Sequence, residues 1–335
     1  MIALRTEVIL PKIENKLSYR RNALMVGSCF TENIGNYLQN HCFPILTNPC
    51  GILYNPASMA DCMGFLVSEH QFGVEDLFFA NGLWNNFNFH SRFSDPDQEL
   101  ALQGMNDSLA EASVQLRTAS HIFLTFGTSW IYREKENGEV VGNCHKLSAS
   151  RFNRERLTVE EMSNLWINLI NQLLAINPNL SIILTISPIR HLKDGNFENQ
   201  VSKSALFLLV EKLISVFGSD KITYFPSYEL VMDELRDYRF YATDMVHLSE
   251  TAISFVQEKF NEIFLDNESK KVLIIIEKIV KALSHRPFQK ESQSFRDFIQ
   301  RQTDEILKLE LQYPFINFGH LKNDIIQNKG DIIFS

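Results

Sequence analysis

Short apolar segments that end in small or polar residues recur along this chain, and a segment with helical periodicity follows most of them. The clearest are residues 23–26, 121–126, 181–186 and 222–225, and a weaker one covers 43–46. Continuous apolar runs that alternate with amphipathic helices are typical of parallel strands buried on both faces. Five such strands predict a three-layer α/β fold, in which a parallel sheet lies between two layers of helices.

The helical segments suggest how the chain is divided. Residues 1–266 are expected to form the α/β domain, with well-marked helices at about 158–176 and 200–217. Residues 57–120 are longer than one helical crossover requires, so we expect an insertion there that forms a lid or a pocket wall. Within it, Ser94 is expected to cap a helix that begins near Pro96.

Residues 267–335 form a helical C-terminal extension in this prediction. Its helices cover about 270–283 and 292–311, are separated by His-Arg-Pro-Phe, and are followed by a short tail. The extension either packs on the core or mediates self-association, so a homo-oligomer formed through these helices is one expectation.

Charge and cysteine content exclude several classes of protein. The 40 acidic and 32 basic residues give a net charge of −8, which provides no footprint for nucleic acid or an anionic membrane surface. The first residues lack a basic region before an apolar run, so we expect no export signal and a cytoplasmic location. Five cysteines without a CxxC pair argue against disulfides and a zinc ribbon, and Cys42, Cys50 and Cys62 match no standard metal-ligand spacing.

Ser28 is the candidate nucleophile. It follows the first expected strand, and ligands of such folds collect outside the carboxyl ends of the strands, where Gly51, Ser129 and Ser187 would also lie. A serine capping the next helix would look the same in sequence. Cys29 is the rival nucleophile, although as the next residue it is expected to point into the interface between sheet and helix.

A serine hydroxyl needs a histidine that removes its proton and an acid that orients that histidine. Asp244-Met-Val-His247 supplies such a pair after the fifth strand, and a spacing of three lets the carboxylate reach Nδ1 and leaves Nε2 for the serine. The alternative is an ordinary helix start with a solvated surface. Ser249 is expected to cap the next helix and so to hold the loop.

Several segments resemble one family. Val-Gly-Ser-Cys-Phe-Thr-Glu-Asn-Ile-Gly is similar to the signature of the GSCFA family, which itself resembles the SGNH/GDSL hydrolases. Asn-Pro-Cys-Gly-Ile-Leu-Tyr-Asn-Pro, His-Ser-Arg-Phe-Ser, Gly-Thr-Ser-Trp, Ser-Pro-Ile-Arg-His and Asp-Met-Val-His extend the resemblance over roughly residues 20–260. It implies a flavodoxin-like sheet.

The resemblance also implies an oxyanion hole built from the serine N–H, a glycine after the second strand and an asparagine after the third. Ser28 and Gly51 match the first two, but Gly127-Thr-Ser129 lacks the asparagine. The Ser129 hydroxyl, Asn143 or Asn55 would have to replace it. His90 and His191 are either substrate-binding residues of a polar pocket or structural groups.

These observations together predict a serine esterase-like hydrolase that acts on a small ester, with an O-acylated carbohydrate as the expected substrate. Ser28, His247 and Asp244 form its triad, and neither a metal nor an organic cofactor is expected. The alternatives are an acyltransferase that uses the same site and a noncatalytic carbohydrate-binding or scaffold protein.

Overall fold

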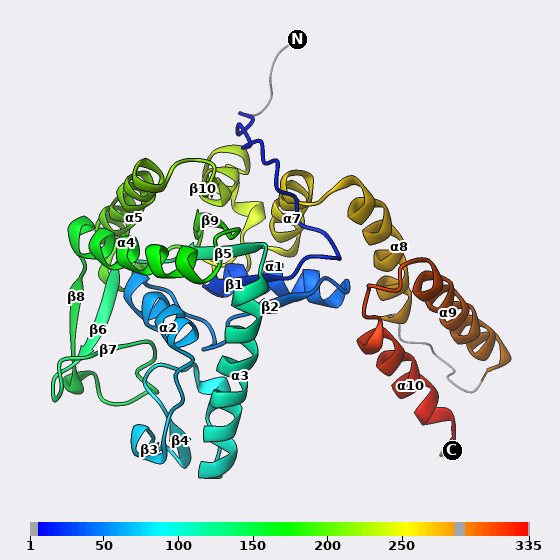
Figure 1. Cartoon of the computed structure of the whole chain (residues 1–335), viewed down its shortest axis with the longest axis horizontal. Coiled ribbons are helices and arrows are strands. Elements are labelled where there is room, and N and C mark those ends of the chain that lie inside the picture. Colours follow the sequence, from blue (N-terminus) through cyan, green and yellow to red (C-terminus); the bar gives the residue numbers. More distant parts are fainter. Residues whose placement is uncertain (1–5, 285–291, 334–335) are drawn as a thin grey trace.

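A parallel sheet forms the centre of the computed structural model, which describes residues 6–284 and 292–333, with the backbone alone for 327–333. Within these residues the five strands have the order β10-β9-β5-β1-β2 (Figure 1). They are β1 (Ala23–Gly27), β2 (Ile45–Thr47), β5 (His121–Phe126), β9 (Ser181–Ile186) and β10 (Ile222–Phe225). The expected strands and the flavodoxin-like order are confirmed, and the order reverses between β1 and β5, beside the residues that follow β1.

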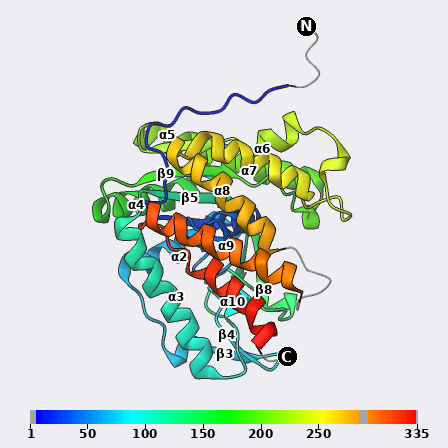
Figure 2. The same cartoon turned by 90° about the vertical axis from the view of Figure 1, so that its right-hand side faces the viewer.

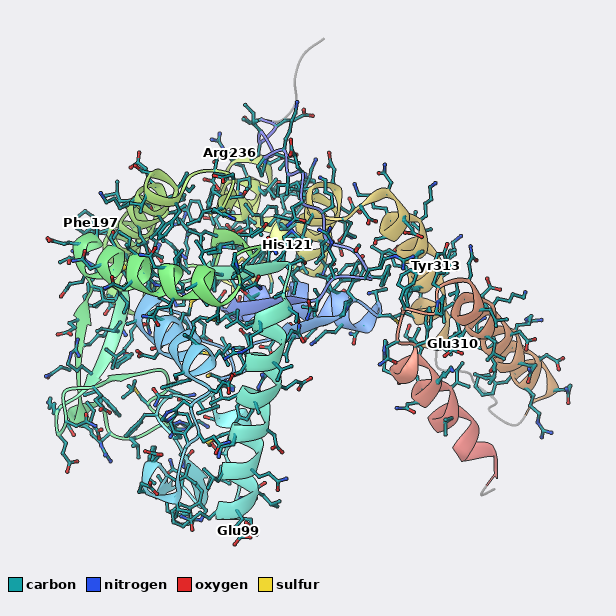
Figure 3. The ribbon with its side chains drawn as sticks, in the orientation of Figure 1. Glu99, His121, Phe197, Arg236, Glu310 and Tyr313 are labelled. Atoms are coloured by element: carbon teal, nitrogen blue, oxygen red, sulfur yellow. The ribbon has the colours of Figure 1, made fainter. Side chains whose placement is uncertain are left out.

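One face of the sheet is covered by four helices. They are α2 (Pro56–Ser68), α3 (Gln98–Thr118), α4 (Val159–Ile176) and α5 (Asn196–Phe217). Alternate strand side chains such as Leu24, Ile122 and Leu184 join them in one buried cluster, because successive residues of a strand point to opposite faces. Side chains fill the space between sheet and helices (Figure 3).

The opposite face is covered by α1 (Cys29–Asn40) and α7 (Glu250–Phe264), followed by α8 (Asn267–Leu283), α9 (Gln293–Gln312) and α10 (Gly319–Ile333). Figures 1 and 2 show α8, α9 and α10 beyond this side of the sheet. Their buried side chains belong to the same apolar cluster as strand residues of that face, including Met25, Phe123, Ile276, Phe318 and Leu321. The helical extension therefore packs on the core, whereas self-association stays a prediction.

The C-terminal extension contains a further helix beyond the two that were expected. The segment after residue 311 is not a plain tail, because α10 forms there and buries Leu321 and Ile325. The expected His-Arg-Pro-Phe separator, residues 285–288, lies outside the described residues.

The expected insertion is only partly a protrusion. Both α2 and α3 are core helices, and the excursion between them contains the short hairpin β3 (Phe78–Ala80) and β4 (Leu83–Asn85), with 3-10 turns at Val74–Asp76 and Ser91–Phe93. Ser94 does not cap α3. Asp97 does so by accepting the N–H groups of Glu99 and Leu100, while Ser94 Oγ donates to Asn85 Oδ1 at 2.8 Å.

A small antiparallel sheet follows β5 and was not expected. It consists of β6 (Trp130–Glu134), β7 (Val140–Val141) and β8 (Phe152–Arg156), with a 3-10 turn at Ala149–Arg151. Shorter helical turns follow the later strands of the main sheet, at Leu192–Asp194, Ser227–Glu229, Leu230–Glu234 and Tyr238–Phe240. No helix in the described part of the chain has the length and apolar character needed to cross a membrane.

Candidate active site

Ser28 lies between β1 and α1. It occupies the N-cap position of α1 with extended backbone angles, but its side chain makes no capping hydrogen bond. The residue is 1% exposed, and Oγ has no hydrogen-bond partner among the described residues. A capping role is therefore not what holds this hydroxyl in place. An unpaired buried hydroxyl at a helix start, where N–H groups and the positive end of the dipole gather, is suited to reaction with an electrophile.

Gly27 shows why β1 ends where it does. Its φ is +152°, and a Cβ added to it would lie 2.6 Å from the Thr125 carbonyl oxygen. Only glycine fits this position without strain. The Gly27 N–H donates to Asn48 Oδ1 at 2.8 Å, so the loop after β2 is attached directly to the residue before Ser28.

Asn48 is fully buried and holds a left-handed conformation with φ of 52°, which asparagine tolerates better than most residues. Its N–H donates to the Met25 carbonyl at 2.8 Å, and its carbonyl accepts the Arg92 guanidinium. Because Oδ1 accepts from Gly27, the amide orientation is fixed and Nδ2 carries the donors. Nδ2 has no partner among the described residues, so a free donor lies close to Ser28.

Lys203 ties together the ends of two other strands. It projects from α5, is 1% exposed, and donates through Nζ to the Gly127 and Ser187 carbonyl oxygens, both at 2.6 Å. Burial lowers the pKa of Lys203 to about 7, with a further contribution from the positive charge of Arg190. The loops after β5 and β9 are thus held by one buried amine at the edge that carries Ser28.

Asp244 and His247 form the expected pair. Oδ2 of Asp244 lies 2.6 Å from Nδ1 of His247, and Oδ1 accepts the N–H groups of Val246 and His247, each at 2.9 Å. These hydrogen bonds, that from His247 first, lower the pKa of Asp244 to about 2. The carboxylate therefore stays ionised and holds the tautomer in which Nε2 is free to accept a proton. Ser249 caps α7 as predicted.

The pair and the serine are not in contact in this structure. Ser28 is buried, whereas the side chains of His247 and Asp244 are 56% and 51% exposed. Ser28 Oγ forms no hydrogen bond with any described residue. The structure therefore contains the Asp244–His247 pair, and the complete triad stays a prediction.

Cys29, the rival nucleophile, begins α1 beside Ser28. It is partly exposed and not fully buried in the interface between sheet and helix as expected. Burial nevertheless raises the pKa of its thiol, and Glu32 adds to this effect. A thiol with a raised pKa is protonated at neutral pH and is a poor nucleophile.

The expected oxyanion donors are engaged elsewhere. The Gly51 N–H closes a turn onto the Asn48 carbonyl at 2.7 Å, so it is not a free donor here. Gly51 is instead required for space, because an added Cβ would lie 2.1 Å from His90 Cβ and φ is +82°. The N–H and hydroxyl of Ser129 both bond to Ser202 Oγ, at 2.8 and 3.0 Å, which directs Ser129 into the fold.

The two asparagines proposed as substitutes also have structural partners. Asn55 caps α2, accepting the Ser58 N–H at 2.9 Å and donating to its hydroxyl. Asn143 accepts the His145 N–H at 2.8 Å within its own loop. Neither residue is placed as a free donor to Ser28, because each amide group stabilises local backbone.

The two histidines differ. His90 starts a 3-10 turn and its Nδ1 accepts the Arg92 N–H at 3.2 Å, which is a structural role. His191 lies at the strand edge, and its Nε2 would be 3.1 Å from a Cβ added to Gly127. This nitrogen is buried without a partner among the described residues. Burial lowers the pKa of His191 to about 4, and His247 is close enough to add to the effect, so His191 is neutral near pH 7.

The buried side-chain atoms without a partner in the described chain include four at this edge, which we call the unpaired set: Ser28 Oγ, Thr31 Oγ1, Asn48 Nδ2 and His191 Nε2. Thr31 belongs to it because Oγ1 would lie 2.8 Å from a Cβ added to Gly27. Buried polar groups are almost always paired, so these atoms are available to a ligand or a water molecule.

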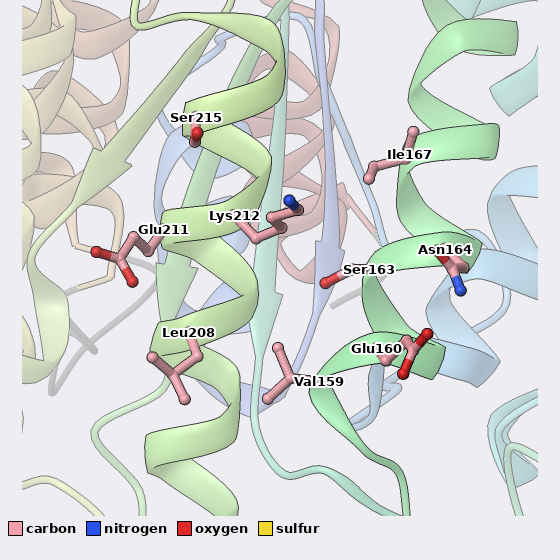
Figure 4. A pocket seen from close by; sticks show the side chains of 9 residues that line it. All are labelled: Val159, Glu160, Ser163, Asn164, Ile167, Leu208, Glu211, Lys212 and Ser215. Carbon is pink, nitrogen blue, oxygen red and sulfur yellow. The ribbon is translucent and has the colours of Figure 1, made fainter.

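The pockets lined by described residues include two of substantial volume. One of about 720 Å³ lies between α4 and α5, lined by residues such as Ser163, Leu208 and Lys212 (Figure 4), and includes none of the predicted site residues. The other, of about 490 Å³, lies between the loop after β9 and the segment after β10. Its lining includes Met245, between Asp244 and His247, so this second pocket adjoins the candidate site.

Sequence reasoning missed Asn48 and Lys203. Asn48 stands in a loop rich in turn residues, where asparagine is common, so its amide carries no special signal in the sequence. Lys203 does have a signal in the sequence, because its spacing places it on the same buried face of α5 as Leu206, Val210 and Leu213. A lysine on the core face of an amphipathic helix indicates a buried amine with dedicated acceptors.

The sequence profile of the GSCFA family matches residues 22–260, which is more than half of the chain. The chain belongs to the GSCFA family. A second profile, described as the C-terminal domain of GSCFA domain proteins, matches residues 276–327 and covers α9 and parts of α8 and α10 of this GSCFA protein. No curated protein matches the chain.

Three solved structures are similar to this GSCFA protein at low identity. An acetyl xylan esterase from the rumen bacterium Butyrivibrio proteoclasticus is 13% identical with a TM-score of 0.37; the match covers 73% of this chain and 63% of the esterase, less than two thirds. A carbohydrate esterase of family 3 from Talaromyces cellulolyticus is 7% identical with a TM-score of 0.36, and the coverages are 77% and 99%. A putative platelet activating factor from Streptococcus pneumonia is 14% identical with a TM-score of 0.33, and the coverages are 72% and 83%.

Proposed function

We propose that this GSCFA protein is a serine esterase-like hydrolase that acts on a small ester, with an O-acylated carbohydrate as the expected substrate. The observation that carries the proposal is the unpaired hydroxyl of Ser28 at the start of α1, beside the point where the strand order reverses. Ligands of doubly wound sheets bind at that point. The Asp244–His247 pair, on the loop between β10 and α7, supplies the base and its orienting acid.

In the proposed reaction, Ser28 Oγ attacks the carbonyl carbon of the ester while its proton passes to His247 Nε2. Asp244 holds Nδ1–H and stabilises the imidazolium that forms. The imidazolium then gives the proton to the departing alkoxide, which leaves an acyl group on Ser28. Water, activated by the same histidine, adds to the acyl carbon and releases the acid.

The tetrahedral intermediates carry a negative oxygen that needs donors. With Gly51 and Ser129 engaged elsewhere, two candidate donors beside Ser28 are its own N–H at the start of α1 and Asn48 Nδ2, which has no partner among the described residues. We assign the oxyanion to these two groups, so Asn48 takes the role for which an asparagine after the third strand was expected.

Catalysis also requires Ser28 Oγ and His247 Nε2 to come into hydrogen-bond contact. The segment from Tyr241 to Leu248, closed by an isolated bridge between those two residues, carries the histidine and is the part that must move. Catalytic hydrogen bonds often form only when substrate is bound, so an open arrangement of the free protein is compatible with the reaction.

A fluorophosphonate probe, which phosphonylates activated serines, tests the proposal. We expect labelling of the native protein at Ser28, loss of labelling in Ser28→Ala, and labelling slower by at least about 10²-fold in His247→Ala. Cys29→Ala is the matched control for the neighbouring residue and should label like the native protein. Labelling that persists in Ser28→Ala, or a folded native protein that does not label at all, would count against the assignment.

Acyl transfer to an acceptor other than water is the second candidate, and the burial of Ser28 favours it. A nucleophile that is 1% exposed limits access of water to the acyl intermediate. The two reactions share every residue named above. Acyl transfer predicts that the ester is consumed with a product that depends on an added sugar acceptor, whereas hydrolysis predicts a rate independent of it.

A further inference from the structure

The pocket of about 490 Å³ beside the candidate site has a composition that selects a kind of substrate. Apolar and aromatic side chains form much of its wall, including Met232, Leu235, Tyr238 and Tyr241. Its volume falls within the range of sites for small molecules.

Two lining residues join this pocket to the proposed chemistry. Met245 lies between Asp244 and His247 and is 56% exposed, with a φ of 59° that a methionine rarely adopts. Arg190, on the other side, directly precedes His191, whose Nε2 lies against Gly127 at the end of β5. A molecule held in this pocket therefore lies beside the loop that carries the proposed base.

Arg190 is the cation of this pocket that is not neutralised by the protein. Within the described residues its guanidinium forms no ion pair and contacts Met232 Sδ at 3.6 Å. Two carboxylates of the segment after β10 are already paired: Asp233 with Arg236 at 3.3 Å, and Asp237, which also lines the pocket, with Arg239 at 3.6 Å. A partly buried guanidinium without a carboxylate favours a carboxylate or phosphate, which it can hold through two parallel hydrogen bonds.

We infer that this pocket binds an anionic group on the substrate, so the enzyme prefers esters that carry a carboxylate or a phosphate on an apolar or ring-shaped body. This inference rests on the proposed function for its link to catalysis. For an O-acylated carbohydrate, the description corresponds to an acylated sugar acid or sugar phosphate. Arg190 is then a specificity-determining residue, and the local charge counters the net charge of −8, which would otherwise repel such a substrate.

The kinetic test compares acetate esters that differ in their anionic group: phenyl acetate, 4-acetoxybenzoate and 4-acetoxyphenyl phosphate. We expect kcat/KM for at least one anionic ester to exceed that for phenyl acetate by about 10-fold or more, through KM. Arg190→Gln should remove this advantage, so that the ratio of kcat/KM between the anionic esters and phenyl acetate falls to about 1, while Arg190→Lys retains part of it. Arg236→Gln is the matched control, because Arg236, labelled in Figure 3, lines the same pocket but is 68% exposed and paired.

A binding test separates this inference from the proposed function. Ser28→Ala protein, which cannot form the acyl intermediate, is titrated with benzoate, phenyl phosphate and uncharged benzamide by calorimetry. We expect an anion to bind at least about 10-fold tighter than benzamide, and the additional change Arg190→Gln to abolish the difference. If the anions bind in an Arg190-dependent way but the native protein hydrolyses no ester, the proposed function is wrong and the anion site remains. Equal binding of all three probes, or an anion preference that survives Arg190→Gln, would overturn the inference.

Discussion

Asn48→Asp is the substitution that most directly tests the assigned oxyanion donor. The carboxylate keeps an oxygen where Oδ1 accepts the Gly27 N–H at 2.8 Å, and aspartate tolerates the left-handed φ of 52°. The change removes only the Nδ2 donors, which have no partner among the described residues. It therefore separates the donor from the structural role of the side chain.

Loss of one well-placed oxyanion donor lowers kcat by about 10² to 10³, equivalent to about 3–4 kcal/mol, and a negative charge at the same position can only add to this loss. KM should change little, because the donor acts on the charge that develops during reaction. The measurement is steady-state hydrolysis of an acetate ester at pH 7.5, with circular dichroism to confirm the fold.

The pH dependence gives a second readout. Position 48 is 0% exposed, and burial disfavours a charged carboxylate, so the introduced aspartate should titrate above its usual range. When protonated it offers an O–H donor, so the rate relative to the native protein should rise as the pH falls. Asn48→Ala lacks both donor and acceptor and should be impaired at every pH. If Asn48 merely holds Gly27, Asn48→Asp will keep the native kcat while Asn48→Ala loses activity, and that result would refute the donor assignment.

Two further predictions concern the acid and the buried amine. Asp244→Asn keeps an oxygen for the N–H groups of Val246 and His247 but no longer fixes the Nδ1–H tautomer of His247. We therefore expect kcat for ester hydrolysis to fall by about 10³ to 10⁴, with little change in the melting temperature measured by differential scanning fluorimetry. Activity within tenfold of native would exclude Asp244 as the orienting acid. For Lys203, the folded pKa of about 7 lies below the 10.5 of an unperturbed lysine, so the unfolded chain binds more protons between these values and stability rises with pH. The stability of native protein relative to Lys203→Met, from urea unfolding at pH 7, 8 and 9, should therefore increase by up to about 1.4 kcal/mol per pH unit, and a constant difference would mean that Lys203 does not titrate in this window.

Local sequence patterns were sufficient to predict the strands of the main sheet and the helices between them, whereas the flavodoxin-like strand order was implied by the resemblance to the GSCFA family. The strands at 121–126 and 181–186 are continuous apolar runs because both their faces are buried, and this pattern is hard to produce otherwise. The strands of the small sheet lack it. Residues 152–156 include three charged side chains and pair with 130–134 across an intervening loop, so neither composition nor periodicity distinguished them from loop.

The candidate site also has one part that could be predicted from the sequence and another that could not. Asp244 and His247 are three residues apart, so their hydrogen bond follows from local geometry and could be predicted. Asn48 acquires its free amide donor only because Gly27, on a neighbouring strand, occupies its oxygen. Whether a residue is paired is decided by tertiary contacts, and the sequence therefore indicated Ser28 but assigned its donors to Gly51 and Ser129, which the fold uses elsewhere.

The unpaired set has a consequence for how this fold can change over evolutionary time. A buried hydroxyl or amide without a partner costs stability, so replacing Thr31 by valine or Ser28 by alanine would raise the free energy of unfolding. Persistence of such groups in a lineage requires that their chemistry be used. Heat-adapted descendants with the same activity would have to accumulate their stabilising changes in the two apolar clusters on either side of the sheet. A descendant that replaced the unpaired set with apolar residues would keep the fold but lose the catalytic activity.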